Sequence, residues 1–275
     1  VWTAGELRAG PAWVRTLDAA AGAEGLAAVE RVQYAGLAMD AIGPDDFPLP
    51  TLGPVLADVI DQVEGGRGVT LLRGVPIEGL SMPQVEVLFW GLASHIGYPE
   101  PQDARGTRLH HVRAAHVFAD QASAQAAFQD GTLRGYQTNV ELDFHGDGSD
   151  ALFFLCVQGA KGGGISRIVS VGQAFNTLLA RDPELAAVLQ QLDALDAALN
   201  DPAHAHSFLM QPGDIQIASN YSVLHARTTF EEWPEPERKR HMLRIWATLR
   251  RNRRPLPPAY RTTREFAASQ ARRVA

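Results

Sequence analysis

Two patterns of hydrophobic and polar positions divide the chain. Residues 19–38, 55–66 and 81–97 carry apolar side chains at helical spacing, and the last of these segments begins at a Ser81 cap and ends at Gly97. Residues 68–77 form a short β-rich run bounded by glycine and proline, which predicts a strand. From about residue 107, further strand-like runs follow one another, at residues 108–118, 132–139, 151–159, 166–172, 214–220, 223–230 and 241–249. One predicted helix, residues 171–191, interrupts them.

Many short strands at close spacing are typical of a sandwich or barrel and not of a βαβ alternation. We therefore expect a mainly β fold with flanking helices. The chain is expected to form a single catalytic domain over residues 1–275. Its helix-rich N-terminal part, about residues 1–100, would pack on a β core at about residues 66–250.

Composition narrows the class of protein further. The chain is 45% hydrophobic and 20% charged with a net charge of −6, so nucleic acid and anionic membranes are not expected partners. No run of 18 apolar residues or signal pattern is present, which makes the cytoplasm the expected location; a homo-oligomer is compatible with the sequence. The single cysteine, Cys156, lies in an apolar run and is expected to be a buried thiol.

The segment "ELDFHGDGSD", residues 141–150, raises the question of a metal site. His145 and Asp147 are two apart at a predicted strand end, so their side chains point to the same side. A mononuclear Fe(II) site needs two imidazoles and one carboxylate on one face, and His225 on a later strand is the candidate third ligand. A calcium loop and a plain polar turn are the alternatives; the spacing does not match an EF-hand.

Two arginines on the last predicted strand indicate an anionic ligand. Arg240 and Arg244 are four apart, so a strand would turn both toward the interior of the barrel. A buried arginine without a partner is costly, and a dicarboxylate co-substrate would satisfy it.

Taken together and in order, "FHGDGSD", "AKGGGISRIVS", "PGDIQIASNYSVLHARTTF" and "RHMLRIW" resemble the TauD/TfdA family of Fe(II)/2-oxoglutarate-dependent dioxygenases, from about residue 66 to about residue 250. The resemblance implies a double-stranded β-helix (jelly-roll) core. It implies that His145, Asp147 and His225 are the iron ligands and that Ser166 and Arg240 bind the distal carboxylate of 2-oxoglutarate. Arg244 matches a position for an anionic group of the substrate, and the division of roles between the two arginines stays open.

The implied reaction consumes O₂ and 2-oxoglutarate and oxidises an unactivated C–H bond of a small molecule, with release of succinate and CO₂. An amino acid or a natural-product intermediate is the expected substrate. Hydroxylation is the expected outcome, and desaturation or cyclisation by the same chemistry is an alternative. A jelly roll that binds 2-oxoglutarate or another metabolite without turnover is the rival function.

Residues near the ligands are assigned to the pocket mouth on their position alone. These candidate substrate contacts are Gln137, Asn139, Leu142 and Tyr221. His204 and His206 have the two-residue spacing of a metal pair but are expected to be surface histidines, and His241 is expected to point away from the arginine face.

One departure from the family concerns the spacing of the ligands. Asp147 and His225 are only 78 residues apart, whereas the family has a longer interval there. We expect that a lid segment of roughly 50 residues is absent around residues 190–192, either because it is disordered or because it was removed, since long lid segments are where disorder is expected.

Overall fold

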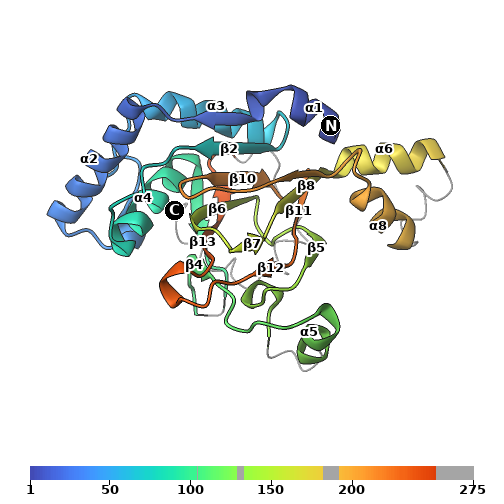
Figure 1. Ribbon diagram of the computed structural model, residues 1–275. Coiled ribbons are helices and arrows are strands. Elements are labelled where there is room, and N and C mark those ends of the chain that lie inside the picture. Colours follow the sequence, from blue (N-terminus) through green and yellow to red (C-terminus); the bar gives the residue numbers. More distant parts are fainter. Residues whose placement is uncertain (104, 129–132, 182–191, 252–275) are drawn as a thin grey trace.

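The computed structural model describes residues 1–103, 105–128, 133–181 and 192–251. Two β-sheets face each other, and helices cover the outer face of the larger sheet (Figure 1). The larger sheet has the strand order β1-β2-β10-β6-β13-β3, with β4 also pairing with β13. The smaller sheet has the order β5-β11-β8-β9, and β12 pairs with β7 in a separate ribbon. This arrangement agrees with the expected jelly-roll core.

The strand bounds follow most of the predicted runs. The larger sheet comprises β1 (Val14–Thr16), β2 (Val69–Arg73), β3 (Gly97–Glu100), β4 (Leu109–Val112), β6 (Ala151–Gln158), β10 (Ile215–Ser219) and β13 (His241–Leu249). The smaller sheet comprises β5 (Leu142–His145), β8 (Ser166–Ser170), β9 (His206–Phe208) and β11 (Val223–Arg227). The ribbon comprises β7 (Gly162–Gly163) and β12 (Phe230–Glu231).

The helices are α1 (Ala4–Ala9), α2 (Ala19–Ala35), α3 (Leu52–Glu64), α4 (Met82–Ile96), α5 (Gln121–Phe128), α6 (Val171–Arg181) and α8 (Leu192–Asn200). Local sequence sets their ends. The Asp18 carboxylate accepts from the backbone N–H of Ala21 at the start of α2, and α2 ends at Gly36, whose φ of 63° suits glycine. Ser81 and Gln84 form a capping box at the start of α4, as the predicted Ser81 cap requires.

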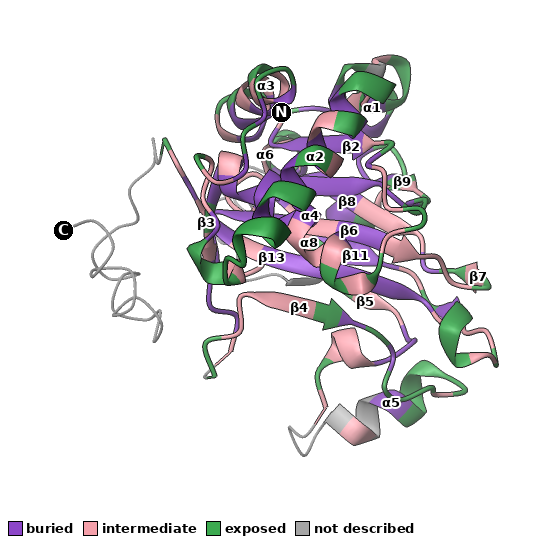
Figure 2. Ribbon diagram, turned by 90° about the vertical axis from the view of Figure 1, so that its left-hand side faces the viewer, coloured by how far each residue is buried: buried purple, intermediate pink, exposed green. Residues whose placement is uncertain are grey.

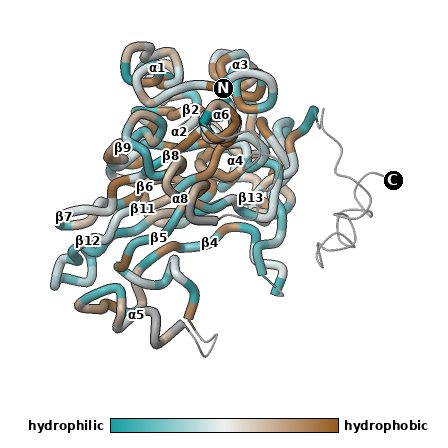
Figure 3. Tube along the Cα trace, turned by 90° about the vertical axis from the view of Figure 1, so that its right-hand side faces the viewer, coloured by the Kyte–Doolittle hydropathy of each residue, from teal (hydrophilic) through white to brown (hydrophobic). Residues whose placement is uncertain are grey.

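Alternation along the central strands separates the core from the interior of the barrel. On β6, β10 and β13 the side chains of Phe153, Ile217 and Ile245 pack against helices α2, α3 and α4 in the main hydrophobic core. Their neighbours Phe154, Gln216 and Arg244 point the other way, into the space between the two sheets. Figure 2 shows buried positions concentrated in the strands and exposed positions on the outer sides of the helices, and Figure 3 shows hydrophobic positions along the same strands and helices.

The N-terminal helices α2, α3 and α4 thus share one hydrophobic core with the strands. That residues 1–275 form a single catalytic domain stays a prediction. Within the described ranges no helix is long and apolar enough to cross a membrane. Cys156 is buried, and burial raises the pKa of its thiol to about 12, so the side chain stays a neutral thiol.

Residues 133–139, the described part of the predicted strand 132–139, do not form a strand, which corrects the prediction there. Residues Gly135–Gln137 form a 3₁₀ turn, and the side chain of Gln137 accepts from the backbone N–H of Arg134 at 2.9 Å. Local side-chain bonding of this kind competes with strand pairing. In the predicted helix 171–191, α6 ends at Arg181, and residues 182–191, with most of the expected lid junction, lie outside the described part of the chain.

Candidate iron centre and co-substrate cavity

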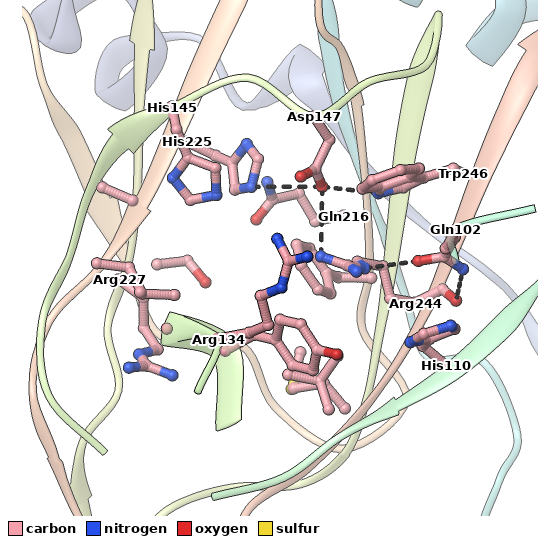
Figure 4. A pocket seen from close by; sticks show the side chains of 18 of the residues that line it. Gln102, His110, Arg134, His145, Asp147, Gln216, His225, Arg227, Arg244 and Trp246 are labelled. Carbon is pink, nitrogen blue, oxygen red and sulfur yellow. Dashed lines mark hydrogen bonds and ion pairs between the residues drawn. The ribbon is translucent and has the colours of Figure 1, made fainter. Parts of the chain in front are cut away.

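A cavity of about 730 Å³ lies between the two sheets (Figure 4). The smaller sheet contributes His225 and Arg227 from β11 and Ser166 from β8. The larger sheet contributes Arg244 and Trp246 from β13. Polar side chains therefore converge from both walls on one cavity, which is the usual form of a small-molecule site.

His145, Asp147 and His225 come together at one end of this cavity. One ligand atom from each lies within 4.8 Å of the other two, and this is the one such cluster of His, Cys, Asp and Glu found among the described residues. His145 and His225 are directly opposite each other in the β5–β11 pairing, and their rings are 4.2 Å apart. The structure thus brings together the three residues singled out in the sequence.

Neighbouring groups fix the orientation of the His145 imidazole and keep the His225 imidazole neutral, and both effects favour metal binding. Nδ1 of His145 lies 2.7 Å from the backbone carbonyl oxygen of Asp143, which leaves Nε2 as the free ligand atom when Nδ1 donates. Burial, together with nearby His145, lowers the pKa of His225 to about 3, so the imidazole of His225 is neutral at ordinary pH.

The Asp147 carboxylate is held from the opposite wall. The indole Nε1 of Trp246 donates to its Oδ2 at 2.8 Å, and Nη1 of Arg244 lies 3.6 Å from the same oxygen. The backbone N–H of Asp147 donates to Oδ1 of Asn220 at 3.0 Å, which ties the loop after β5 to the turn before β11. These contacts orient a carboxylate that is only 9% exposed.

Arg244 is positioned by several neighbours. Its Nε donates to Oε1 of Gln102 at 2.7 Å, and its guanidinium lies between the rings of Tyr136 and Trp246, at 5.1 and 4.9 Å. Burial lowers the pKa of Arg244, and the charge of Asp147 partly offsets this effect. Gln102 was not recognised in the sequence, because only the pairing of the two chain regions brings it to β13.

Arg240 and Ser166 lie in another part of the cavity wall. Arg240 immediately precedes β13, is 8% exposed, and its guanidinium is 5.1 Å from the ring of Phe230. Burial lowers the pKa of Arg240. Gly164 lies beside Arg240, since a Cβ built on it would be 3.4 Å from Nε of Arg240, and its φ of +65° favours glycine.

A family model described as "Taurine catabolism dioxygenase TauD, TfdA family" matches residues 33–192 and 188–246. The chain belongs to the TauD/TfdA family. Membership confirms the resemblance noted in the sequence, the jelly-roll fold and the expected class of Fe(II)/2-oxoglutarate-dependent dioxygenase.

Individual TauD/TfdA relatives are distant. "FR-33289 synthase" of Streptomyces rubellomurinus is 26% identical over 324 residues, covering 96% of this chain and 93% of the relative. "Taurine hydroxylase-like protein SAT17" of Stachybotrys chartarum is 24% identical over 279 residues, covering 81% of this chain and 72% of the relative.

Solved structures with the same fold include two oxygenases in complex with hydroxylated amino acids. Asparagine oxygenase, in complex with Fe(II), 2S,3S-3-hydroxyasparagine and succinate, has a TM-score of 0.62 at 16% identity, covering 90% of this chain and 98% of that chain. The non-haem iron oxygenase OrfP, in complex with Fe, succinate and (3S)-hydroxy-L-Arg, has a TM-score of 0.57 at 14% identity, covering 90% of this chain and 98% of that chain.

Of the four assigned pocket-mouth residues, Leu142 lines the cavity. Gln137, Asn139 and Tyr221 do not, and a role for them as substrate contacts stays a prediction. Gln137 caps its own turn. The Asn139 amide bonds the backbone of Phe118 and Phe230, and the Tyr221 hydroxyl donates to Asp150 at 2.6 Å.

Three other histidines are buried, contrary to expectation for two of them. His204 and His206 were expected at the surface, but His204 contacts Thr177 and His206 packs edge-on against Trp13. His241, expected to point outward, does not line the cavity, but it is buried, with its Nε2 2.9 Å from Nδ1 of His111. Other polar residues line the cavity that the sequence did not single out; they include Gln102, His110, Arg134, Gln216 and Arg227.

Proposed function

We propose that this TauD/TfdA dioxygenase holds Fe(II) with His145, Asp147 and His225 and hydroxylates an unactivated C–H bond of a small anionic molecule. The observation that carries the proposal is the convergence of two imidazoles and one carboxylate within 4.8 Å at one end of a buried cavity. This donor set suits a mononuclear Fe(II) that keeps open positions for other ligands.

The iron, when bound, would supply the oxidative chemistry. In that reaction O₂ oxidises both 2-oxoglutarate and a C–H bond of the substrate, and the products are succinate, CO₂ and the oxidised substrate. The residues of the chain bind the iron and the small molecules, orient them, and exclude water from the cavity. Trp246 keeps the Asp147 carboxylate in one orientation through its N–H donation. The two sheets enclose the reacting groups, which strengthens the electrostatic contacts inside.

Ser166 and Arg240 are the proposed partners of the distal carboxylate of 2-oxoglutarate. Both line the cavity, and Arg240 lies beside the glycine run that leads into Ser166. A buried guanidinium offers a paired donor geometry that matches a carboxylate. Arg244 is closer to the Asp147 carboxylate, at 3.6 Å, and is better placed for an anionic group of the substrate.

An amino acid or a natural-product intermediate is the proposed class of substrate. The fold is shared with an asparagine oxygenase and an oxygenase that binds hydroxy-L-Arg, and the curated relative is named as the synthase of FR-33289. A single carboxylate of such a substrate would satisfy Arg244, whose Nε is already fixed by Gln102.

Anaerobic titration tests the assignment of the ligands. Metal-free protein receives Fe(II) and then 2-oxoglutarate, and the visible charge-transfer band of the chelate is recorded for wild type, His145→Ala, Arg240→Ala and the control His116→Ala. The band is expected in wild type and control, to vanish in His145→Ala, and to require more 2-oxoglutarate in Arg240→Ala. Folded, metal-loaded wild type without the band would contradict the proposal. Succinate release with a panel of L-amino acids then searches for the substrate.

A further inference from the structure

Arg227 is a buried cation in the cavity wall that the proposed function has not used. It ends β11, two residues after His225, so both side chains lie on the same face of that strand. Its partner across the β8–β11 pairing is Ser166, and both residues line the cavity. Figure 4 shows Arg227 on the same wall as the two histidines.

The guanidinium of Arg227 is incompletely satisfied. The side chain is 6% exposed, its Nη2 donates to the carbonyl oxygen of Val140, and its buried Nε has no hydrogen-bond partner among the described residues. Its Cζ is 4.6 Å from the centre of the Phe230 ring, and Cζ of Arg240 is 5.1 Å from the same ring. Two buried guanidinium groups thus lie around one aromatic side chain.

The local charges do not cancel. Glu232 accepts from the backbone N–H of Arg240 at 2.9 Å, and its negative charge stabilises both guanidinium groups. Two cations against this one carboxylate leave a net charge of +1.

A buried, uncompensated cation is costly unless an anion joins it. The negative charge of Glu232 offsets one of the two positive charges, and the remaining positive charge attracts an anion. One carboxylate would bring this part of the cavity to neutrality and supply an acceptor for Nε. The distal carboxylate of a 2-oxo dicarboxylic acid has the required charge and chemistry.

We propose that Arg227 is a second co-substrate-binding residue, which together with Arg240 and Ser166 holds the distal carboxylate of 2-oxoglutarate and makes the site selective for dicarboxylic 2-oxo acids. This inference rests on the proposed function. It assigns the net positive charge of the subsite to Arg227.

Two ligands that differ only in the distal carboxylate test the inference. Fe(II)-loaded protein is titrated anaerobically with 2-oxoglutarate and with 2-oxopentanoate, which has the same five-carbon chain and no distal carboxylate. Arg227→Gln is expected to weaken 2-oxoglutarate binding about 10- to 100-fold, as for loss of a charge-assisted hydrogen bond. Binding of 2-oxopentanoate is expected to stay within about twofold, because no anion then faces residue 227.

Two further variants complete the design. Arg227→Lys keeps the charge but loses the planar fork, so we expect a several-fold weaker affinity for 2-oxoglutarate, and this variant carries the test if the glutamine variant does not fold. Arg167→Gln is the matched control, because Arg167 lies on the neighbouring strand outside the cavity, 3.3 Å from Glu141, and its loss should change neither affinity.

The outcomes separate this inference from the proposed function. The inference alone would be overturned if the wild-type protein binds 2-oxoglutarate and the Arg227 variants still prefer 2-oxoglutarate to 2-oxopentanoate as strongly as the wild type does. Equal losses for both ligands would overturn it too, because they would show only a structural role. A wild-type protein that forms no chelate would overturn the proposed function and this inference with it.

Discussion

Substitution of Trp246 by phenylalanine removes one hydrogen bond from the proposed iron ligand and little else. The indole N–H donates to Oδ2 of Asp147 at 2.8 Å, and the carboxylate is only 9% exposed, so water replaces the lost donor poorly. A phenyl ring keeps the packing against the Arg244 guanidinium, 4.9 Å from the present ring. A hydrogen bond to a charged group contributes about 1.5–3 kcal/mol, so we expect Trp246→Phe to weaken Fe(II) binding about 10- to 100-fold.

The assay is the dissociation constant for Fe(II), measured anaerobically by competition with a chromogenic chelator. Trp90→Phe is the matched control, because the indole of Trp90 donates to the carbonyl oxygen of Ile42 at 3.2 Å in the helical core, away from the cavity. The control should change Fe(II) affinity less than twofold. Equal affinities for wild type and Trp246→Phe, or equal losses in both variants, would refute the view that Trp246 orients the metal-binding carboxylate.

Three further predictions follow from individual contacts. Ser166→Ala should weaken 2-oxoglutarate binding about fivefold in the anaerobic titration, because one neutral hydrogen bond contributes about 1 kcal/mol; unchanged affinity would remove Ser166 from the subsite. Asn139→Ala should lower the free energy of unfolding in urea by about 2–3 kcal/mol through the loss of three backbone contacts, with 2-oxoglutarate affinity unchanged, and a loss of affinity would restore Asn139 to the site. Burial, then Arg113 and His111, lower the pKa of His241 to about 3, so below pH 6.5 the unfolded chain binds the extra proton and stability falls by up to about 1.4 kcal/mol per pH unit down to pH 3. His241→Gln should remove this contribution, so that the stability measured by thermal unfolding falls less steeply between pH 7 and 5 than in the wild type. An equally steep fall in the variant would contradict the view that His241 is buried as a neutral imidazole.

The sequence predicted correctly those features that depend on residues close together in the chain, such as the ends of a helix and the side of a strand on which a residue lies. Ser81 and Gly97 bound α4 because a capping box and a glycine act within one turn of the helix. The two-residue spacing of His145 and Asp147 placed both on one side of a strand end, and the structure has them there. Arg227 follows His225 at the same spacing, so the same alternation marks it as a cavity residue although it was overlooked.

Other parts of the site depend on contacts between distant segments. Gln102 reaches Arg244 only because β3 and β4 pair with β13, and no pattern near residue 102 predicts this contact. Residues 133–139 do not form the predicted strand, because the Gln137 side chain accepts from the backbone N–H of Arg134. Tyr221 was assigned to the pocket by its closeness to His225 in sequence, but its hydroxyl is engaged by Asp150 on the other side of the turn.

Anomalous diffraction from anaerobic crystals with Fe(II) and 2-oxoglutarate would test the central claim most directly. We predict one iron peak within bonding distance of His145, Asp147 and His225, with the distal carboxylate of 2-oxoglutarate against Ser166 and Arg240. An iron peak elsewhere, or a distal carboxylate that contacts neither Ser166 nor Arg240, would contradict the account.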